Sequence, residues 1–295
     1  MRVFVTGASG FIGSAVVTEL LEHGHTVLGL ARSDAAAAKV AAMGATVVRG
    51  SLEEHASLRD GVAGSDGVIH LGFNHDFSKF AENCALDRRA IEAIGAALEG
   101  SQRPLLTTSG MALLAPGQLA TEALGFKPVS EYFPRASEEM TGKLAERGVC
   151  ASVVRLAPSV HGMGDHGFVA MLAGIARGKG FSAYIGAGDN RWPAVHRFDA
   201  ARLYRLALEH GAGGVRYHAV GEEGVPFREI ASAIGAGIDL PVHSVAPDEA
   251  AAHFTWFTMF AGMDAPSSGA ETRRVLGWEP RERGLLEDLR TPGYF

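Results

Sequence analysis

The first thirteen residues constrain the fold of this chain more than any other segment. A short apolar run at 3–5 is followed by glycines at positions 7, 10 and 13, and then by a predicted helix from 14 to 21. Such a run predicts a buried parallel strand. Gly7 permits a tight turn off the strand, Gly10 lets backbone approach a pyrophosphate, and Gly13 lets the helix pack closely on the sheet. The pattern predicts a dinucleotide at the helix N-terminus, where unpaired N–H groups and the helix dipole favour anions.

The spacing of these glycines, Gly-x-x-Gly-x-x-Gly, resembles the signature of the extended short-chain dehydrogenases and reductases. Five later segments resemble further landmarks of that superfamily, in the same order along the chain. They are 66–72 (its fourth strand), 107–110 (its fifth strand, with the active-site serine), 155–162 (the loop over the nicotinamide), 195–201 and 276–280. The resemblance covers nearly the whole chain and indicates the NAD-dependent epimerase/dehydratase type of these enzymes.

Strands alternate with helical patterns through the first half, which predicts an α/β fold with a doubly wound parallel sheet of the Rossmann type. We expect a dinucleotide-binding domain at 1–157 and a smaller C-terminal α/β substrate lobe at 158–295, opened by Pro158. The predicted strands are 25–30, 46–48, 68–71, 104–108 and 151–156, and the predicted helices 35–43, 80–98, 167–177, 200–210, 227–234, 255–265 and 270–276. In relatives, helices at 80–98 and about 131–147 form a dimer bundle, so the resemblance implies a homodimer.

Composition sets bounds on the class of protein. The chain has 295 residues, 47% of them apolar, which is enough for a sizeable core. The net charge of −6, without any basic block, argues against nucleic acid as a partner. The two cysteines, Cys84 and Cys150, are too few for a disulfide framework, and no metal-ligand spacing surrounds them. Because we find no signal peptide and no apolar stretch long enough to span a bilayer, we expect a cytoplasmic protein that makes no contact with membranes.

The residues after the second predicted strand favour NADP over NAD. Enzymes that use NAD usually place a carboxylate there to hold the ribose hydroxyls, whereas this chain has Ala31, followed by Arg32 and Ser33. An arginine can pair with a 2′-phosphate and stack on adenine, and the serine can donate a hydrogen bond. Farther on, Ser51 replaces the aspartate that the family usually has near the adenine. We therefore predict NADP(H) as the cofactor.

The resemblance implies a fuller set of cofactor-binding positions, in the glycine turn, at strand ends and in the loop over the nicotinamide. The set is Gly7, Ser9, Gly10, Phe11, Ile12, Gly13, Arg32, Ser33, Ser51, Leu52, Leu71, Gly72, Phe73, Thr108, Pro158 and Val160. A small-molecule substrate is expected as the other partner.

The Tyr-x-x-x-Lys motif of the superfamily is absent. That spacing puts both side chains on one helix face, where the lysine holds the nicotinamide ribose and lowers the pKa of the tyrosine. No tyrosine of this chain has a lysine four residues later. Two registers could replace the motif. One pairs Lys143 with Glu139, an ordinary surface ion pair; the other aligns Arg135 with the lysine and Glu131 with the tyrosine, with Tyr132 beside it. The sequence leaves both registers open.

Other polar residues near the predicted carboxyl edge of the sheet could take part in the chemistry. Ser109 stands where the family serine binds the substrate carbonyl. His75 follows the fourth strand and could donate a proton with Asp76 nearby, although adjacent residues seldom orient each other well, and a surface turn is the alternative. The catalytic candidates are therefore Ser109, Tyr132, Lys143 and His75.

These features predict an NADPH-dependent oxidoreductase that reduces a carbonyl-type group on a small, partly apolar substrate. The protein would orient the substrate and supply a proton donor other than the standard Tyr/Lys pair. A non-catalytic NADP-binding redox sensor is the alternative, because the tyrosine is missing. Sugar-nucleotide epimerisation ranks third, since it usually needs that tyrosine.

Overall fold

The computed structural model describes residues 1–130 and 133–295, so Glu131 and Tyr132 lie outside the described residues. The chain divides into two compact units. The first comprises 1–109, 125–155 and 200–217, and the second comprises 110–124, 156–199 and 218–295. The chain leaves the first unit after Arg155, close to the boundary predicted at 157/158, but it exchanges between the units at further points, because a late helix and strand return to the first unit.

The first unit is built on a seven-stranded sheet with the order β10-β6-β5-β4-β1-β2-β3. The strands are β1 (Arg2–Thr6), β2 (Thr26–Ala31), β3 (Thr46–Arg49), β4 (Gly67–His70), β5 (Leu105–Gly110), β6 (Ala151–Leu156) and β10 (Arg216–Ala219). β1 pairs in parallel with both β2 and β4, and β4 pairs in parallel with β5. The strand order reverses between β1 and β4, which is where doubly wound sheets bind ligands. The predicted Rossmann sheet is confirmed.

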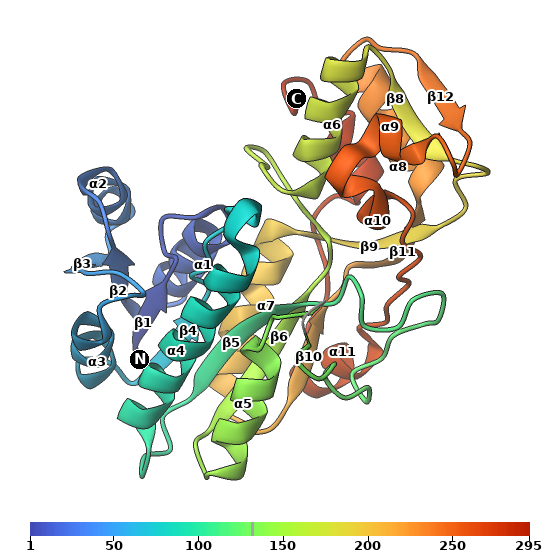
Figure 1. Ribbon diagram of the computed structural model, residues 1–295. Helices are drawn as coiled ribbons and strands as arrows, with labels where there is room; N and C mark the ends of the chain where they lie inside the picture. The colour runs from blue at the N-terminus through green and yellow to red at the C-terminus, as the bar shows by residue number, and fades with distance from the viewer. Residues whose placement is uncertain (131–132) are drawn as a thin grey trace. The chain divides into compact units, whose positions relative to one another are not determined.

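Helices cover both faces of this sheet, as Figure 1 shows. They are α1 (Phe11–Glu22), α2 (Asp34–Ala42), α3 (His55–Ala63), the short η1 (Phe77–Lys79), α4 (Phe80–Leu98), α5 (Ser137–Glu146) and α7 (Arg197–His210). Along β5, Thr107 bonds to Thr141 of α5, and the next residue, Thr108, bonds to Tyr204 of α7. Because successive side chains of a strand alternate between its faces, α5 and α7 lie on opposite sides of the sheet.

The helix predicted at about 131–147 is shorter than expected. α5 begins only at Ser137, and residues 133–136 are not helical. Pro134 accounts for part of this difference, since the residue before a proline is disfavoured in the α conformation. Position 135 therefore lies on a loop that leads into the helix. The homodimer expected from α4 and this helix stays a prediction.

The second unit contains two small sheets, with the orders β11-β9-β7 and β12-β8. Its strands are β7 (Ser159–His161), β8 (Ser182–Ile185), β9 (Arg191–His196), β11 (Glu222–Pro226) and β12 (Val242–Val245). Its helices are α6 (Phe168–Lys179), α8 (Phe227–Gly237), α9 (Ala250–Phe254), η2 (Thr255–Phe257), α10 (Thr258–Ala261), α11 (Ala270–Leu276) and α12 (Leu285–Leu289). The helix predicted at 255–265 is thus divided into two short turns and ends early.

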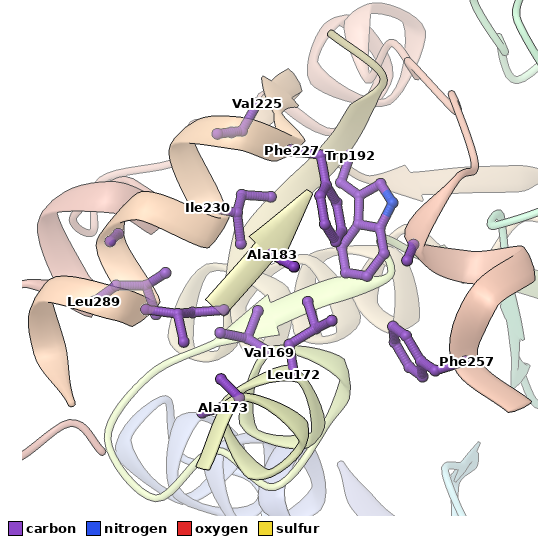
Figure 2. Packing of buried hydrophobic residues seen from close by; sticks show 14 of the residues in the cluster. Val169, Leu172, Ala173, Ala183, Trp192, Val225, Phe227, Ile230, Phe257 and Leu289 are labelled. Carbon is purple, nitrogen blue, oxygen red and sulfur yellow. The ribbon is translucent and has the colours of Figure 1, made fainter. Parts of the chain in front are cut away.

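The core of the second unit gathers around Trp192 and Phe227, both fully buried with ring centroids 5.0 Å apart. Figure 2 shows the two rings side by side, with Val169 and Leu172 of α6 pointing toward the same core. The aromatic segment at 254–260 contributes Phe257 to this core, whereas Trp256 is 54% exposed. Within the described residues, no helix is both long and apolar enough to cross a lipid bilayer.

Two histidines and a carboxylate are buried together in the second unit. His161 Nδ1 lies 2.8 Å from Asp288 Oδ2, and His196 Nε2 lies 3.9 Å from the same oxygen. Burial, and then the positive field of His161, lower the pKa of His196 to about 4, against the weaker opposite effect of Asp288. The folded protein therefore keeps His196 neutral at pH values where the unfolded chain protonates it.

We predict that stability falls on acidification through this histidine. The unfolded chain takes up a proton near pH 6.5 and the folded protein only near 4, so the unfolding free energy decreases as the pH falls between these values. From pH 7 to 5 the loss through His196 is about 1 kcal/mol, after allowance for solvent screening. The unfolding free energy, measured by urea titration at each pH, should change less with pH in H196Q than in the wild type across this window. In H210Q, which alters an exposed histidine, it should change with pH as it does in the wild type. The same pH dependence of the unfolding free energy in H196Q as in the wild type would contradict the prediction.

Candidate functional site

The glycine turn after β1 requires glycine at its first and third positions. Gly7 adopts a φ of +70°, and a Cβ there would lie 2.8 Å from the backbone nitrogen of Gly72. A Cβ at Gly13 would lie 2.0 Å from the carbonyl oxygen of Gly7, closer than any real contact. The turn is closed by the Gly10 N–H, which donates to the Gly7 oxygen at 2.9 Å. The first turn of α1 is therefore held directly against the ends of β1 and β4.

The N-terminus of α1 is open to an anion. Gly10 is the N-cap, no side chain caps the helix, and its first turn contains no acidic residue. Ser9, Phe11 and Ile12 are each partly exposed around this turn. Unsatisfied N–H groups and the helix dipole suit a diphosphate at such a position. The cradle fits a dinucleotide, whereas the described residues hold no cluster of three or more side chains that could bind a metal ion.

The loop after β2 carries a positive charge. Arg32 is exposed and makes no hydrogen bond or ion pair with another described residue. Ser33 caps α2, because its Oγ accepts from the backbone N–H of Ala36 at 3.2 Å, and its hydroxyl hydrogen is still available to donate. The nearby carboxylate of Asp34 pairs with Arg49 at 2.9 Å. The charge of Arg32 is therefore not offset by its neighbour in sequence.

The ends of β1, β3 and β4 meet at one edge of the sheet. Leu52 lies against Gly72, where an added Cβ would be 3.2 Å from Leu52 Cδ2, and the Leu71 N–H donates to the Thr6 carbonyl at 3.3 Å. Ser51 is partly buried beside Leu52. The structure thus brings five of the predicted cofactor positions together: Gly7, Gly13, Leu52, Leu71 and Gly72.

Two predicted positions belong to the second unit. Pro158 and Val160 flank and enter β7, and the structure does not place them relative to the first unit. Thr108 lies at the predicted edge, but its hydroxyl is used within the fold, since it donates to the His70 carbonyl at 2.8 Å and lies 2.7 Å from Tyr204 Oη. Burial raises the pKa of Tyr204, which is fully buried, so this tyrosine does not replace the missing one.

A chain of buried hydrogen bonds connects the glycine turn to the loop before α5. The Gly72 N–H donates to Thr6 Oγ1 at 3.1 Å, and this hydroxyl lies 2.8 Å from His70 Nδ1. On the other side of the ring, His70 Nε2 lies 3.0 Å from Asp87 Oδ1. The Ser137 hydroxyl donates to Asp87 Oδ2 at 2.5 Å. One carboxylate therefore joins β1, β4, α4 and α5.

The ionised carboxylate of Asp87 determines which groups donate to it in this network. Because the ionised carboxylate of Asp87 can only accept hydrogen bonds, His70 Nε2 carries a hydrogen and donates to it. Burial opposes ionisation of Asp87, yet the hydrogen bond and electrostatic attraction of His70, then the field of Arg135 and the hydrogen bond from Ser137, outweigh burial and hold the pKa of this carboxyl below its ordinary value. Asp87 is thus a buried anion with both oxygens bonded.

Of the two open registers, the structure brings Arg135 to the site edge. Arg135 Nε donates to Ser137 Oγ at 3.1 Å, one terminal nitrogen donates to the Thr108 carbonyl at 3.4 Å, and the guanidinium carbon lies 4.4 Å from the centre of the Phe73 ring. Lys143 is exposed and pairs with Glu139 at 2.6 Å on the outer face of α5. Among the described residues, no contact of Lys143 with the edge of the sheet supports its predicted catalytic role.

His75 and Ser109 differ in their surroundings. His75 is exposed, and its ring lies 5.3 Å from that of Phe73. Asp76 does not orient it, because Asp76 Oδ1 accepts from the Ser78 N–H and hydroxyl and so caps η1. Ser109 is 7% exposed near the end of β5.

Sequence reasoning missed His70, Asp87 and Ser137. A signal existed for Asp87, which falls on the face of 80–98 that holds Cys84, Ala90 and Ile91, all buried. A charged residue at helical spacing among apolar ones is almost never buried without a partner. That partner, however, lies on another strand, and nothing in the local sequence identifies it.

Comparisons with known proteins agree with this geometry. The sequence profile of the NAD dependent epimerase/dehydratase family matches residues 3–220. An uncharacterised protein of Schizosaccharomyces pombe is 52% identical over the full length of both chains. A 2-alkyl-3-oxoalkanoate reductase of Stenotrophomonas maltophilia is 29% identical over 100% of this chain and 91% of its own. A nucleoside-diphosphate-sugar epimerase from Pseudomonas aeruginosa has the same fold, with a TM-score of 0.78 at 19% identity, over 98% of this chain and 95% of that one.

We predict that G13A disrupts the cradle. The added methyl group would overlap the Gly7 carbonyl, so the turn must shift, and the free energy of unfolding should fall by at least about 2 kcal/mol. G174A in α6 is the control, because no atom lies within 4 Å of its added Cβ; it should be neutral or slightly stabilising. Urea unfolding measures both, and equal stabilities would contradict the assigned packing.

A second prediction concerns the buried carboxylate. In D87N one of the two oxygens becomes an amide donor that faces His70 or Ser137, so one buried donor loses its acceptor. The expected loss of unfolding free energy is about 2–3 kcal/mol. D60N on the exposed side of α3 should change it by less than about 0.5 kcal/mol. A similarly small loss in D87N would show that the network contributes nothing to stability.

Proposed function

Because the chain belongs to the NAD-dependent epimerase/dehydratase family, we propose that it is an NADPH-dependent oxidoreductase that reduces a carbonyl group on a small, partly apolar substrate. The observation that carries this proposal is the carboxyl edge of the large sheet. There an open dinucleotide cradle at Gly7 and a fixed guanidinium at Arg135 are joined by one buried hydrogen-bond network. The reductase of Stenotrophomonas maltophilia, which aligns with the whole chain, supports reduction.

Two features support NADPH in place of NADH. The last residue of β2 is Ala31, so no carboxylate is present to hold the ribose hydroxyls. Arg32 follows, exposed and without an ion pair among the described residues, beside the N-terminus of α2, and both features favour a phosphate there.

The side chains at the edge provide orientation and charge. The bound nicotinamide supplies the hydride. Ser109 donates a hydrogen bond to the carbonyl oxygen, and Arg135 supplies a fixed positive charge beside the bound substrate. His75 and Tyr132 stay predicted candidates for the proton donor, and Tyr132 lies outside the described residues.

A non-catalytic NADP-binding sensor is the second candidate, favoured by the absence of Tyr-x-x-x-Lys. A sensor needs the cradle but has no use for a guanidinium fixed by buried hydrogen bonds. Arg135 and Ser109 therefore favour the enzyme. Epimerisation of sugar nucleotides ranks third, because it usually needs the missing tyrosine.

The test begins with the cofactor. Fluorescence titration of the wild type should show tighter binding of NADPH than of NADH. R32A should lose on the order of tenfold or more in NADPH affinity, equivalent to about 1.5–3 kcal/mol, because a charged hydrogen bond is removed. K39A, which removes an exposed cation of α2, should bind as the wild type does. Equal affinity for both cofactors in the wild type, unaffected by R32A, would remove Arg32 from the site.

Turnover separates the two candidate functions. The wild type with NADPH should oxidise the cofactor in the presence of at least one member of a panel of aldehydes, ketones and oxo acids. A sensor would bind NADPH and turn over none of them.

A further inference from the structure

We propose that Arg135 binds a carboxylate of the substrate, so that the substrates are apolar oxo acids whose carboxylate lies one or two carbons from the carbonyl. This inference rests on the proposed function and specifies the substrate class of the same site. It is carried by the hydrogen bonds that Arg135 makes, by those it leaves unused, and by the rings around it.

Arg135 uses only two of its five N–H groups in hydrogen bonds to the described residues. A guanidinium has five N–H groups, and here Nε is bonded to Ser137 and one N–H of Nη2 to the Thr108 carbonyl. The other three N–H groups have no acceptor among the described residues, and Arg135 makes no ion pair there. A partly buried guanidinium that forms no ion pair with a carboxylate among the described residues is suited to a planar, bidentate anion such as a carboxylate.

No carboxylate at residues 1–130 or 133–295 forms a direct ion pair with Arg135. The carboxylate of Asp87 is the nearest anion of the network, but both of its oxygens are occupied, by His70 and by Ser137, and Ser137 stands between it and the guanidinium. Asp87 therefore positions Arg135 through Ser137, and the three remaining N–H groups of the guanidinium still have no acceptor among the described residues. A cation fixed in this way pays little conformational entropy when it binds an anion.

The surroundings of Arg135 are aromatic. Its guanidinium lies over Phe73, and the Phe73 ring lies 6.2 Å from Phe80, which stacks on Phe77 at 5.9 Å. All three phenylalanines are partly exposed. Apolar rings beside a cation favour a ligand with an anionic end and an apolar body.

The carbonyl position follows from Ser109. Thr107 bonds to Thr141 of α5 at 2.6 Å, and Ser109, two residues along the strand, lies on the same face, about 6.6 Å farther on. Ser137 precedes Thr141 by about 6 Å along α5. Because Thr141 meets Thr107 while the earlier Arg135 reaches the later Thr108 carbonyl, α5 runs antiparallel to β5. Ser109 is therefore level with Ser137, which anchors Arg135. A carbonyl on Ser109 and a carboxylate on Arg135 would therefore lie close together in the substrate, which is why we place them one or two carbons apart.

Calorimetry on protein saturated with NADPH tests the inference without turnover. The probes are 3-phenylpropanoate and 3-phenylpropan-1-ol, which share an apolar body and differ in the anion. We expect the wild type to bind the acid at least tenfold more tightly. R135Q should bind both probes equally, R135K and S137A should retain part of the preference, and R147Q, which removes an exposed cation at the C-terminal end of α5, should retain all of it.

Three other binding outcomes decide against the inference. Equal binding of the two probes by the wild type would overturn it, and this comparison needs no variant to fold. A preference that survives in R135Q would also overturn it. A third contradicting result would be a tenfold loss of NADPH affinity in R135Q while the preference for the acid remains, because Arg135 would then bind the dinucleotide and not the substrate carboxylate. If the acid binds through Arg135 but no carbonyl compound is reduced, the proposed function fails and the anion site stands.

Discussion

The buried carboxylate of Asp87 is the interaction on which the site of the first unit depends. An anion that is 2% exposed is tolerated only when its hydrogen-bonding capacity is met, and here it accepts from His70 on one oxygen and from Ser137 on the other. Through His70 and Thr6 it is connected to the backbone of Gly72, against which the glycine turn packs. Through Ser137 it fixes Arg135. The position of the cofactor cradle and the position of the cation are thus set by one network.

In the function that we propose, this arrangement positions a cation without the Tyr-x-x-x-Lys motif. That motif needs two side chains one turn apart on a helix, but here the helix begins at Ser137, after Arg135, the residue that one of the two open registers aligns with the lysine. Arg135 therefore reaches the edge from a loop, and a loop residue has no helix to orient it. The hydrogen bond to Ser137 and the contact with Phe73 orient its guanidinium instead.

Much of the first unit could be predicted because its signals are local. The strand at 3–5, the glycine turn and the helix at 80–98 are each encoded by a few neighbouring residues, and the structure confirms all three. The choice between Arg135 and Lys143 was not local, because it depends on where α5 begins. The pairing of Asp87 with His70 and Ser137 joins residues 17 and 50 positions apart, which no periodic pattern reports. In the second unit, the short strands and the division of the chain between units escaped prediction for the same reason.

The measurement that tests the central claim most directly is hydride transfer itself. Wild-type protein saturated with NADPH, deuterated at the transferred position, would be incubated with a panel of aldehydes, ketones and oxo acids, and the products analysed by mass spectrometry. The account predicts an alcohol with one deuterium on the former carbonyl carbon, formed together with NADP⁺. Tight binding of NADPH with no deuterium transferred to any compound would contradict it and would identify a protein that binds the cofactor without using it.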